Sequence, residues 1–182
     1  MMLGLLGGTS AMAGVGMDSN GSSSSIPVKI SVGPSLGILS GVVGFGGDVS
    51  VAIAPVSGMP LYVGLESGYY NWSQSASSSG YSQSGTISSV PLLFTGLYAF
   101  DLPNSSPLHP YVGLALGMSF TGASASGDFL SGSGSAVQFE GLLRPGVALD
   151  MGSNIDLAIE PKFGILSSSF VFLPHVDVVF GL

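Results

Sequence analysis

The side chains in this sequence that could do chemistry are a few ionisable residues spread over the length of the chain. The set that we single out comprises Lys29, Asp48, Glu66, Glu140, Arg144, Glu160, Lys162 and Asp177. Brought together, five carboxylates and three cations can form a buried network of paired, hydrogen-bonded charges, and we predict this structural role for them. The alternative is a narrow path for water, protons or small ions, in which the excess of acid would favour cations.

His175 lies two positions before Asp177, so that with serines nearby the pair could belong to a hydrolase or to a metal site. Neither a nucleophile with a matching base nor a ligand cluster at a defined spacing can be recognised. We therefore predict a structural histidine and no catalytic, metal or cofactor site. Tyr70, Trp72 and Tyr81 bracket a serine-rich stretch and could contact a ligand or the cell surface, although anchoring at a membrane interface explains Tyr70 and Trp72 equally well.

Composition limits where the charged side chains can lie. Only 7% of the 182 residues are charged, against roughly a quarter in ordinary soluble domains, while 46% are hydrophobic. Such a chain has too few charges to coat a water-facing surface. The net charge of −7 argues against a nucleic-acid partner, which would require a basic patch.

From residue 26 onward, apolar residues alternate with small or polar ones, which is the period of strands whose two faces meet different surroundings. We predict strands at 26–38, 43–55, 61–70, 86–100, 111–120, 136–149, 155–165 and 170–182. The strand charges fall on the face made of Gly, Ser and Ala, opposite the apolar face. A basic residue facing lipid at mid-bilayer would cost about 2–4 kcal/mol, so this segregation is typical of membrane-crossing strands.

The segments between these strands alternate in length. Those at 55–60, 101–109 and 150–154 are compact, whereas 71–85 and 121–135 are rich in Ser and Gly, and we predict long loops there. No stretch approaches the roughly 20 consecutive apolar residues that a membrane-spanning helix needs. A soluble lipocalin-type barrel would show the inverted pattern, polar outside and apolar inside. The prediction is therefore all-β: an eight-stranded antiparallel up-and-down transmembrane β-barrel over residues 26–182, with both termini periplasmic.

Aromatic residues provide a second indication, because membrane barrels concentrate them at the two interfaces. We predict an outer girdle of Phe45, Tyr69, Phe120, Phe139, Phe170 and Phe172, and an inner girdle of Tyr98, Phe100 and Phe180.

Five prolines fall inside the predicted strands, where each removes a donor from the ladder. They are Pro34, Pro91, Pro145, Pro161 and Pro174. We expect some of them to mark bulges or strand ends, beyond which the register slips by a residue.

The N-terminal region divides into two short segments. Residues 1–13 combine Leu3, Leu5 and Leu6 with the small-residue site Ala11-Met12-Ala13, and this pattern indicates the remnant of a signal peptide cleaved before Gly14. Residues 14–25 form a Ser-rich, flexible lead-in to the barrel.

The chain resembles the small outer-membrane barrels of Gram-negative bacteria, the group of OmpA transmembrane domains, OmpX and OmpW, over residues 26–182. The segments that carry the resemblance are Val90-Pro91-Leu92-Leu93-Phe94, His109-Pro110-Tyr111-Val112-Gly113-Leu114 and the closing alternation Val176, Val178, Phe180 and Leu182. That ending is similar to the signal read by the barrel-assembly machinery, although families usually finish on an aromatic residue.

The resemblance implies an outer-membrane location, with the lipid bilayer, outer-membrane lipids and the assembly machinery as partners. We predict a non-enzymatic structural or surface-exposed barrel. The alternatives are a narrow pore for small solutes or ions through a charged lumen and, ranked last, a lipid-modifying enzyme of the same membrane.

Overall fold

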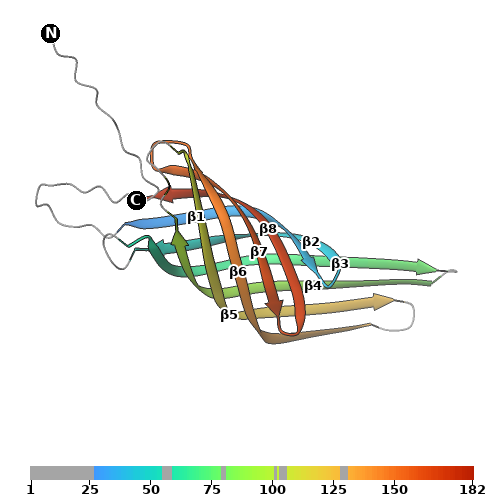
Figure 1. Cartoon of the computed structure of the whole chain (residues 1–182). Coiled ribbons are helices and arrows are strands. Elements are labelled where there is room, and N and C mark those ends of the chain that lie inside the picture. The colour runs from blue at the N-terminus through green and yellow to red at the C-terminus, as the bar shows by residue number, and fades with distance from the viewer. Residues whose placement is uncertain (1–26, 55–58, 79–80, 101, 103–105, 128–130) are drawn as a thin grey trace, which may run out of the picture.

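The computed structural model describes residues 27–54, 59–78, 81–100, 102, 106–127 and 131–182, so the predicted signal remnant and lead-in lie outside the described residues. These residues form eight antiparallel strands in which each strand pairs with its neighbours in the chain and β1 pairs with β8, closing the barrel (Figure 1). The strands are β1 Val28–Leu39, β2 Val42–Ile53, β3 Leu61–Ser78, β4 Tyr81–Ala99, β5 Leu108–Gly127, β6 Gly132–Asp150, β7 Ile155–Leu166 and β8 Ser169–Gly181. The predicted eight-stranded up-and-down barrel is confirmed. In the described part of the chain, no helix is long and apolar enough to cross a membrane.

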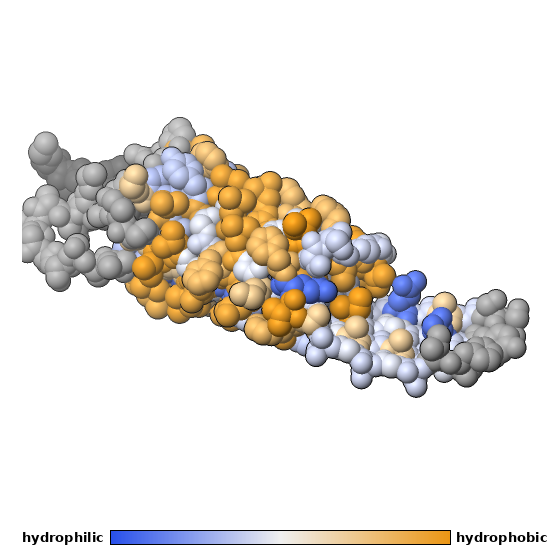
Figure 2. All heavy atoms as spheres, turned by 90° about the horizontal axis from the view of Figure 1, so that it is seen from below, coloured by the Kyte–Doolittle hydropathy of each residue, from blue (hydrophilic) through white to orange (hydrophobic). Residues whose placement is uncertain are grey.

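The strands present an apolar face outward and bury the other face. Phe94 of β4, for example, is 72% exposed, whereas its neighbour Leu93 is fully buried. The same alternation puts exposed apolar side chains on all eight strands and so produces a hydrophobic belt around the barrel, one face of which is seen in Figure 2. An apolar belt of this kind is stable in hydrocarbon and unfavourable in water, so the chain is built to span a membrane.

The segments 71–85 and 121–135, which we predicted to be loops, are mostly strand. β3 and β4 continue as a paired hairpin as far as Ser78 and Tyr81, and β5 and β6 as far as Ala125 and Gly132. Because β4 also pairs with β5 there, four strands extend beyond the barrel as one sheet (Figure 1). The prediction failed because both faces of these segments are polar or small, which removes the contrast from which period two is recognised.

We call this extension, residues 73–78, 81–88, 122–127 and 132–135, the protruding sheet. On the side that continues the lipid-facing surface, alternation places almost only hydroxyl side chains: Ser73, Ser75, Ser77, Ser82, Ser84, Thr86, Ser88, Ser124, Ser126, Ser133 and Ser135. Ser75, Ser84 and Ser126 stand side by side on three strands, and the hydroxyls of Ser84 and Ser126 are 2.8 Å apart. We refer to this side as the hydroxyl face.

The prolines interrupt pairing without changing the register, contrary to our expectation of a slip. On β1 and β8, Val32 pairs with Val178 before Pro34 and Ser35 with His175 after it, in the same register. Pro34 keeps its place opposite Gly47 on its other neighbour, β2. Because the register is constant, the inward and outward faces stay unexchanged past each proline.

Candidate functional site

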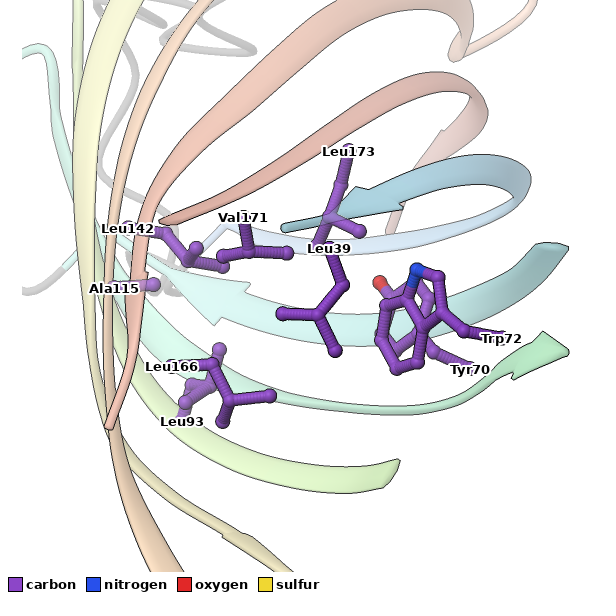
Figure 3. Close-up of a cluster of buried hydrophobic side chains, with 9 residues drawn as sticks. All are labelled: Leu39, Tyr70, Trp72, Leu93, Ala115, Leu142, Leu166, Val171 and Leu173. Atoms are coloured by element: carbon purple, nitrogen blue, oxygen red, sulfur yellow. The ribbon is translucent and has the colours of Figure 1, made fainter. Parts of the chain in front are cut away.

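The interior of the barrel is filled by side chains in three layers. The layer nearest the protruding sheet is a buried apolar plug drawn in Figure 3, which consists of Leu39, Tyr70, Trp72, Leu93, Ala115, Leu142, Leu166, Val171 and Leu173. It draws its residues from all strands except β2.

Sequence reasoning missed this plug because the predicted inward face was small and charged. The available signal was the set of places where alternation fails, such as Leu92-Leu93, Leu142-Leu143 and the run Phe170–Leu173, where both faces must be apolar. Tyr70 and Trp72 point into the plug, with their rings stacked at 5.9 Å, so their predicted interface anchoring is wrong.

The middle layer is a buried cluster of charged and polar side chains that we call the central cluster. Its core is formed by Arg144 on β6 and Lys162 on β7 with three acids, Asp48 on β2, Glu66 on β3 and Glu160 on β7. Arg144 pairs with Glu66 and with Glu160, each at 2.7 Å. The Nζ atom of Lys162 lies 2.5 Å from Asp48, 2.9 Å from Glu66 and 3.5 Å from Glu160. Four strands are thus joined across the lumen.

Tyr70 links this core to His175 and Asp177, which complete the central cluster. The Tyr70 hydroxyl donates to Oδ2 of Asp48 at 2.9 Å and lies 3.2 Å from Nε2 of His175. On its other side, Nδ1 of His175 lies 3.2 Å from Oδ2 of Asp48 and 3.9 Å from Oδ1 of Asp177. Among the residues that the structure describes, Asp48, His175 and Asp177 also bring three donor atoms close enough together to hold a metal ion.

Two of the eight predicted network residues have separate partners. Glu140 accepts a hydrogen bond from the Ser119 hydroxyl. Lys29 lies near the termini, 3.4 Å from Asp156 and 5.4 Å above the ring of Tyr62. The structure therefore joins six of the eight residues through direct contacts in the central cluster and leaves Glu140 and Lys29 in pairs of their own.

The third layer, towards the termini, contains small side chains and tyrosines. Ala99, Tyr111, Ala148 and Ala158 form one buried group, and Ala52, Ala54 and Tyr62 form another. Between them lies a cavity of about 50 Å³, whose lining includes Lys29, Arg144, Glu160 and Asp177. That volume exceeds the roughly 10–15 Å³ that one water needs, so this side of the central cluster has room for solvent.

At the opposite mouth, a hollow of about 620 Å³ lies between the protruding sheet and the short turns of the rim. Gln74, Gln83 and Gly134 line it from the sheet, and Ser40 and Ser169 from the rim. Trp72 forms part of the lining, so the apolar plug is the floor of this hollow.

The predicted girdle residues lie on the outer surface. Phe45, Tyr69, Phe120, Phe139 and Phe170 are exposed towards the protruding sheet, and Phe172 is half-buried beside them. Tyr98, Phe100 and Phe180 are exposed near the termini, where the rings of Tyr98 and Phe100 meet edge to face at 5.4 Å. Their role as interface anchors stays a prediction.

No protein-family model matches the sequence, and comparison with curated protein sequences gives no match. Solved structures do match. Ail, the attachment invasion locus protein of Yersinia pestis, superposes with a TM-score of 0.56 at 13% identity over 86% of this chain and 99% of Ail. A major outer membrane protein of Thermus thermophilus gives 0.56 at 17% identity, over 85% and 99% of the two chains. The N-terminal β-barrel domain of Pseudomonas aeruginosa OprF gives 0.50 at 12% identity, over 85% and 97%.

Identities this low show the fold and leave activity open. Together with the apolar belt, the likeness establishes that this chain has the fold of the small eight-stranded barrels of bacterial outer membranes.

Proposed function

We propose that this chain is a non-enzymatic, integral outer-membrane protein of a Gram-negative bacterium, which presents the protruding sheet as a contact surface outside the cell. The observation that carries the proposal is the contrast between a filled barrel and a long, exposed sheet on one end of it. β8 ends in the outward alternation that assembly machinery reads in similar barrels, and we propose the same partner here.

The state of the lumen favours a structural barrel over a pore. The plug and the central cluster fill consecutive layers with buried side chains, and Lys162, Glu66 and Leu173 are at most 1% exposed. His175, on which the enzymatic alternative depended, is buried in the same cluster, where it cannot reach a lipid on the outer surface.

The chemistry of the protruding sheet indicates the kind of partner. β3 continues six residues past Trp72, which at about 3.3 Å per residue extends the sheet by roughly 20 Å. None of its described residues is charged, and the hydroxyl face offers only donors and acceptors of neutral hydrogen bonds. Ail has been solved with the heparin analogue sucrose octasulfate. The neutral surface here suits instead an uncharged polar partner, such as a neutral glycan.

Single-cysteine labelling tests the location, because the chain has no cysteine of its own. Intact cells producing Ser84→Cys, on the hydroxyl face, should react with a membrane-impermeant maleimide. Cells producing Met59→Cys, an exposed position at the end near the termini, should react only after permeabilisation. Equal labelling of both variants in intact cells would contradict the proposed orientation.

Conductance distinguishes this proposal from the pore. Protein refolded into liposomes should give no steady conductance above that of empty vesicles, because buried side chains fill the plug and the central cluster. Steady, cation-selective conductance that disappears with Glu66→Gln would favour the pore instead.

A further inference from the structure

Three side chains of the central cluster form a compact set of potential metal ligands. Asp48 on β2 and His175 and Asp177 on β8 each offer one donor atom, and these atoms all lie within 4.8 Å of one another. We propose that they bind one divalent transition-metal ion of the Zn²⁺ type inside the barrel.

Two of the donor atoms are buried and make no hydrogen bond, although Nδ1 of His175 lies within ion-pair distance of Oδ2 of Asp48. Nδ1 of His175 and Oδ1 of Asp177 make no hydrogen bond, although their residues are only 1% and 3% exposed. Buried polar atoms are nearly always paired, so an unpaired nitrogen and an unpaired oxygen 3.9 Å apart indicate a missing ligand between them.

The hydrogen bonds around Tyr70 admit the tautomer of His175 that a metal ion requires. In that tautomer the Tyr70 hydroxyl donates to Asp48, its oxygen accepts from Nε2 of His175, and Nδ1 carries the lone pair. A ligating imidazole that donates its other N–H to a neighbour is the usual arrangement in metal sites. Lys162 and Tyr70 both donate to Oδ2 of Asp48 and hold that carboxylate as outer-shell groups do.

The separations suit a small tetrahedral ion. Two ligands bound at about 2.1 Å to a tetrahedral ion lie about 3.4 Å apart. Nδ1 of His175 lies 3.2 Å from Oδ2 of Asp48 and 3.9 Å from Oδ1 of Asp177, and the three donor atoms lie within 4.8 Å of one another, so the two carboxylates would have to draw together around the ion. Gly33 makes room for this part of β8, since a Cβ at that position would clash with Oδ1 of Asp177 and with the carbonyl oxygen of Val176. The cavity that Asp177 lines could provide a water as the fourth ligand.

Charge balance in the lumen supports a cation. Asp48, Glu66, Glu140, Glu160 and Asp177 are buried with only Arg144 and Lys162 as buried cations, an excess of three carboxyl groups among the described residues. Among the residues that the structure describes, His175 is the one basic group within salt-bridge distance of Asp177. A divalent ion beside Asp177 would offset most of the excess. One imidazole with two carboxylates favours a Zn²⁺-type ion over Mg²⁺ or Ca²⁺, which prefer oxygen ligands alone.

The test uses the full chain without a histidine tag, refolded in detergent and stripped with a chelator. Calorimetric titration with Zn²⁺ should show one ion per chain, and Mg²⁺ should bind far more weakly. Asp177→Asn and His175→Gln should each weaken Zn²⁺ binding by at least about tenfold. Asp156→Asn and His109→Gln, the same changes outside the central cluster, should bind Zn²⁺ like the wild type.

Stability gives a second readout, because a ligand that binds only the folded state raises its unfolding temperature. Zn²⁺ should raise the unfolding temperature of the wild-type protein and of Asp156→Asn, but it should not raise the unfolding temperature of Asp177→Asn. Asp177→Asn keeps the shape of the side chain and removes a buried charge, so it decides the matter if His175→Gln fails to fold. The proposal would be overturned if the wild-type protein did not bind Zn²⁺, if Asp177→Asn bound Zn²⁺ as tightly as the wild type, or if Mg²⁺ bound as tightly as Zn²⁺.

Discussion

The ammonium group of Lys162 lies 2.5 Å from a carboxylate oxygen of Asp48, although the two residues are 114 positions apart in the chain. The contact joins β7 to β2 across the interior and not along the sheet, because neither strand neighbours the other in the barrel. It can form only after the barrel has closed. The central cluster therefore depends on closure, and its loss should destabilise the closed state.

Replacing Lys162 with Met should be the most damaging of the charge deletions. It removes the one ammonium near Asp48, Glu66 and Glu160, and an uncompensated buried charge costs about 3–5 kcal/mol in the free energy of unfolding. Lys29→Met removes a cation from a partly exposed pair and should cost at most about 1 kcal/mol. Urea unfolding in lipid vesicles measures both values. If the two variants lost the same free energy of unfolding, the central cluster would contribute no more to stability than the pair of Lys29 and Asp156.

Two adjacent tyrosines provide a matched test of the interior. Tyr70→Phe should lower the free energy of unfolding by about 1.5–3 kcal/mol, since the buried hydroxyl bonds a charged group, Asp48. Tyr69→Phe, on the outer surface, should change it by no more than about 0.5 kcal/mol. The same unfolding experiment applies to both variants. If Tyr69→Phe proves the costlier change, the assignment of faces on β3 is wrong.

How much of this fold follows from the sequence can be seen by comparing β1 with the end of β3. In β1 every second residue apart from Pro34 is large and apolar, so the face of Lys29 is fixed by counting. Beyond Trp72 the residues on both faces are small or polar, and the chain gives no sign of whether it pairs or turns away. Backbone hydrogen bonds continue the strand there, and such pairing cannot be recognised from the pattern of side chains.

The candidate site shows a similar division. Alternation indicates which face each charge occupies, but it does not give the depth of that charge along the barrel axis. Lys29 is the second residue of β1 and so lies at the end near the termini, whereas Arg144 belongs to the middle layer. Depth depends on the shear between strands, which only the pairing register specifies. Asp48 and His175 meet for the same reason, and no spacing in the sequence relates them.

An arginine substitution on the apolar belt should be costly only where hydrocarbon surrounds the barrel. Leu116→Arg, at an exposed position in the middle of β5, should lower the free energy of unfolding in vesicles by about 2–4 kcal/mol. Ser84→Arg, on the hydroxyl face, should change it by less than about 0.5 kcal/mol. Comparable effects at the two positions would mean that the belt as drawn in Figure 2 does not contact lipid.

Trp72 is the one tryptophan of the chain and is 3% exposed, so its fluorescence reports directly on the plug. We expect blue-shifted emission that acrylamide quenches weakly. Gly37→Ala should shift the emission to the red and increase quenching, because the new Cβ would lie 2.9 Å from Nε1 of Trp72. Gly85→Ala, whose nearest neighbour is 3.8 Å away, is the control and should leave the spectrum unchanged. Strong quenching of the wild type would contradict a packed plug.

The protruding sheet rises from only one part of the rim, since β1, β2, β7 and β8 end at short turns while β3 to β6 continue. Seen along the membrane normal, the molecule is consequently lopsided. A molecule approaching over the low turns arrives at the mouth and its tryptophan floor, whereas one approaching from the tall flank encounters rows of hydroxyls. A neighbouring molecule in a crowded envelope would thus meet a different surface on each side, so that a single small barrel has two distinct sides in the plane of its membrane.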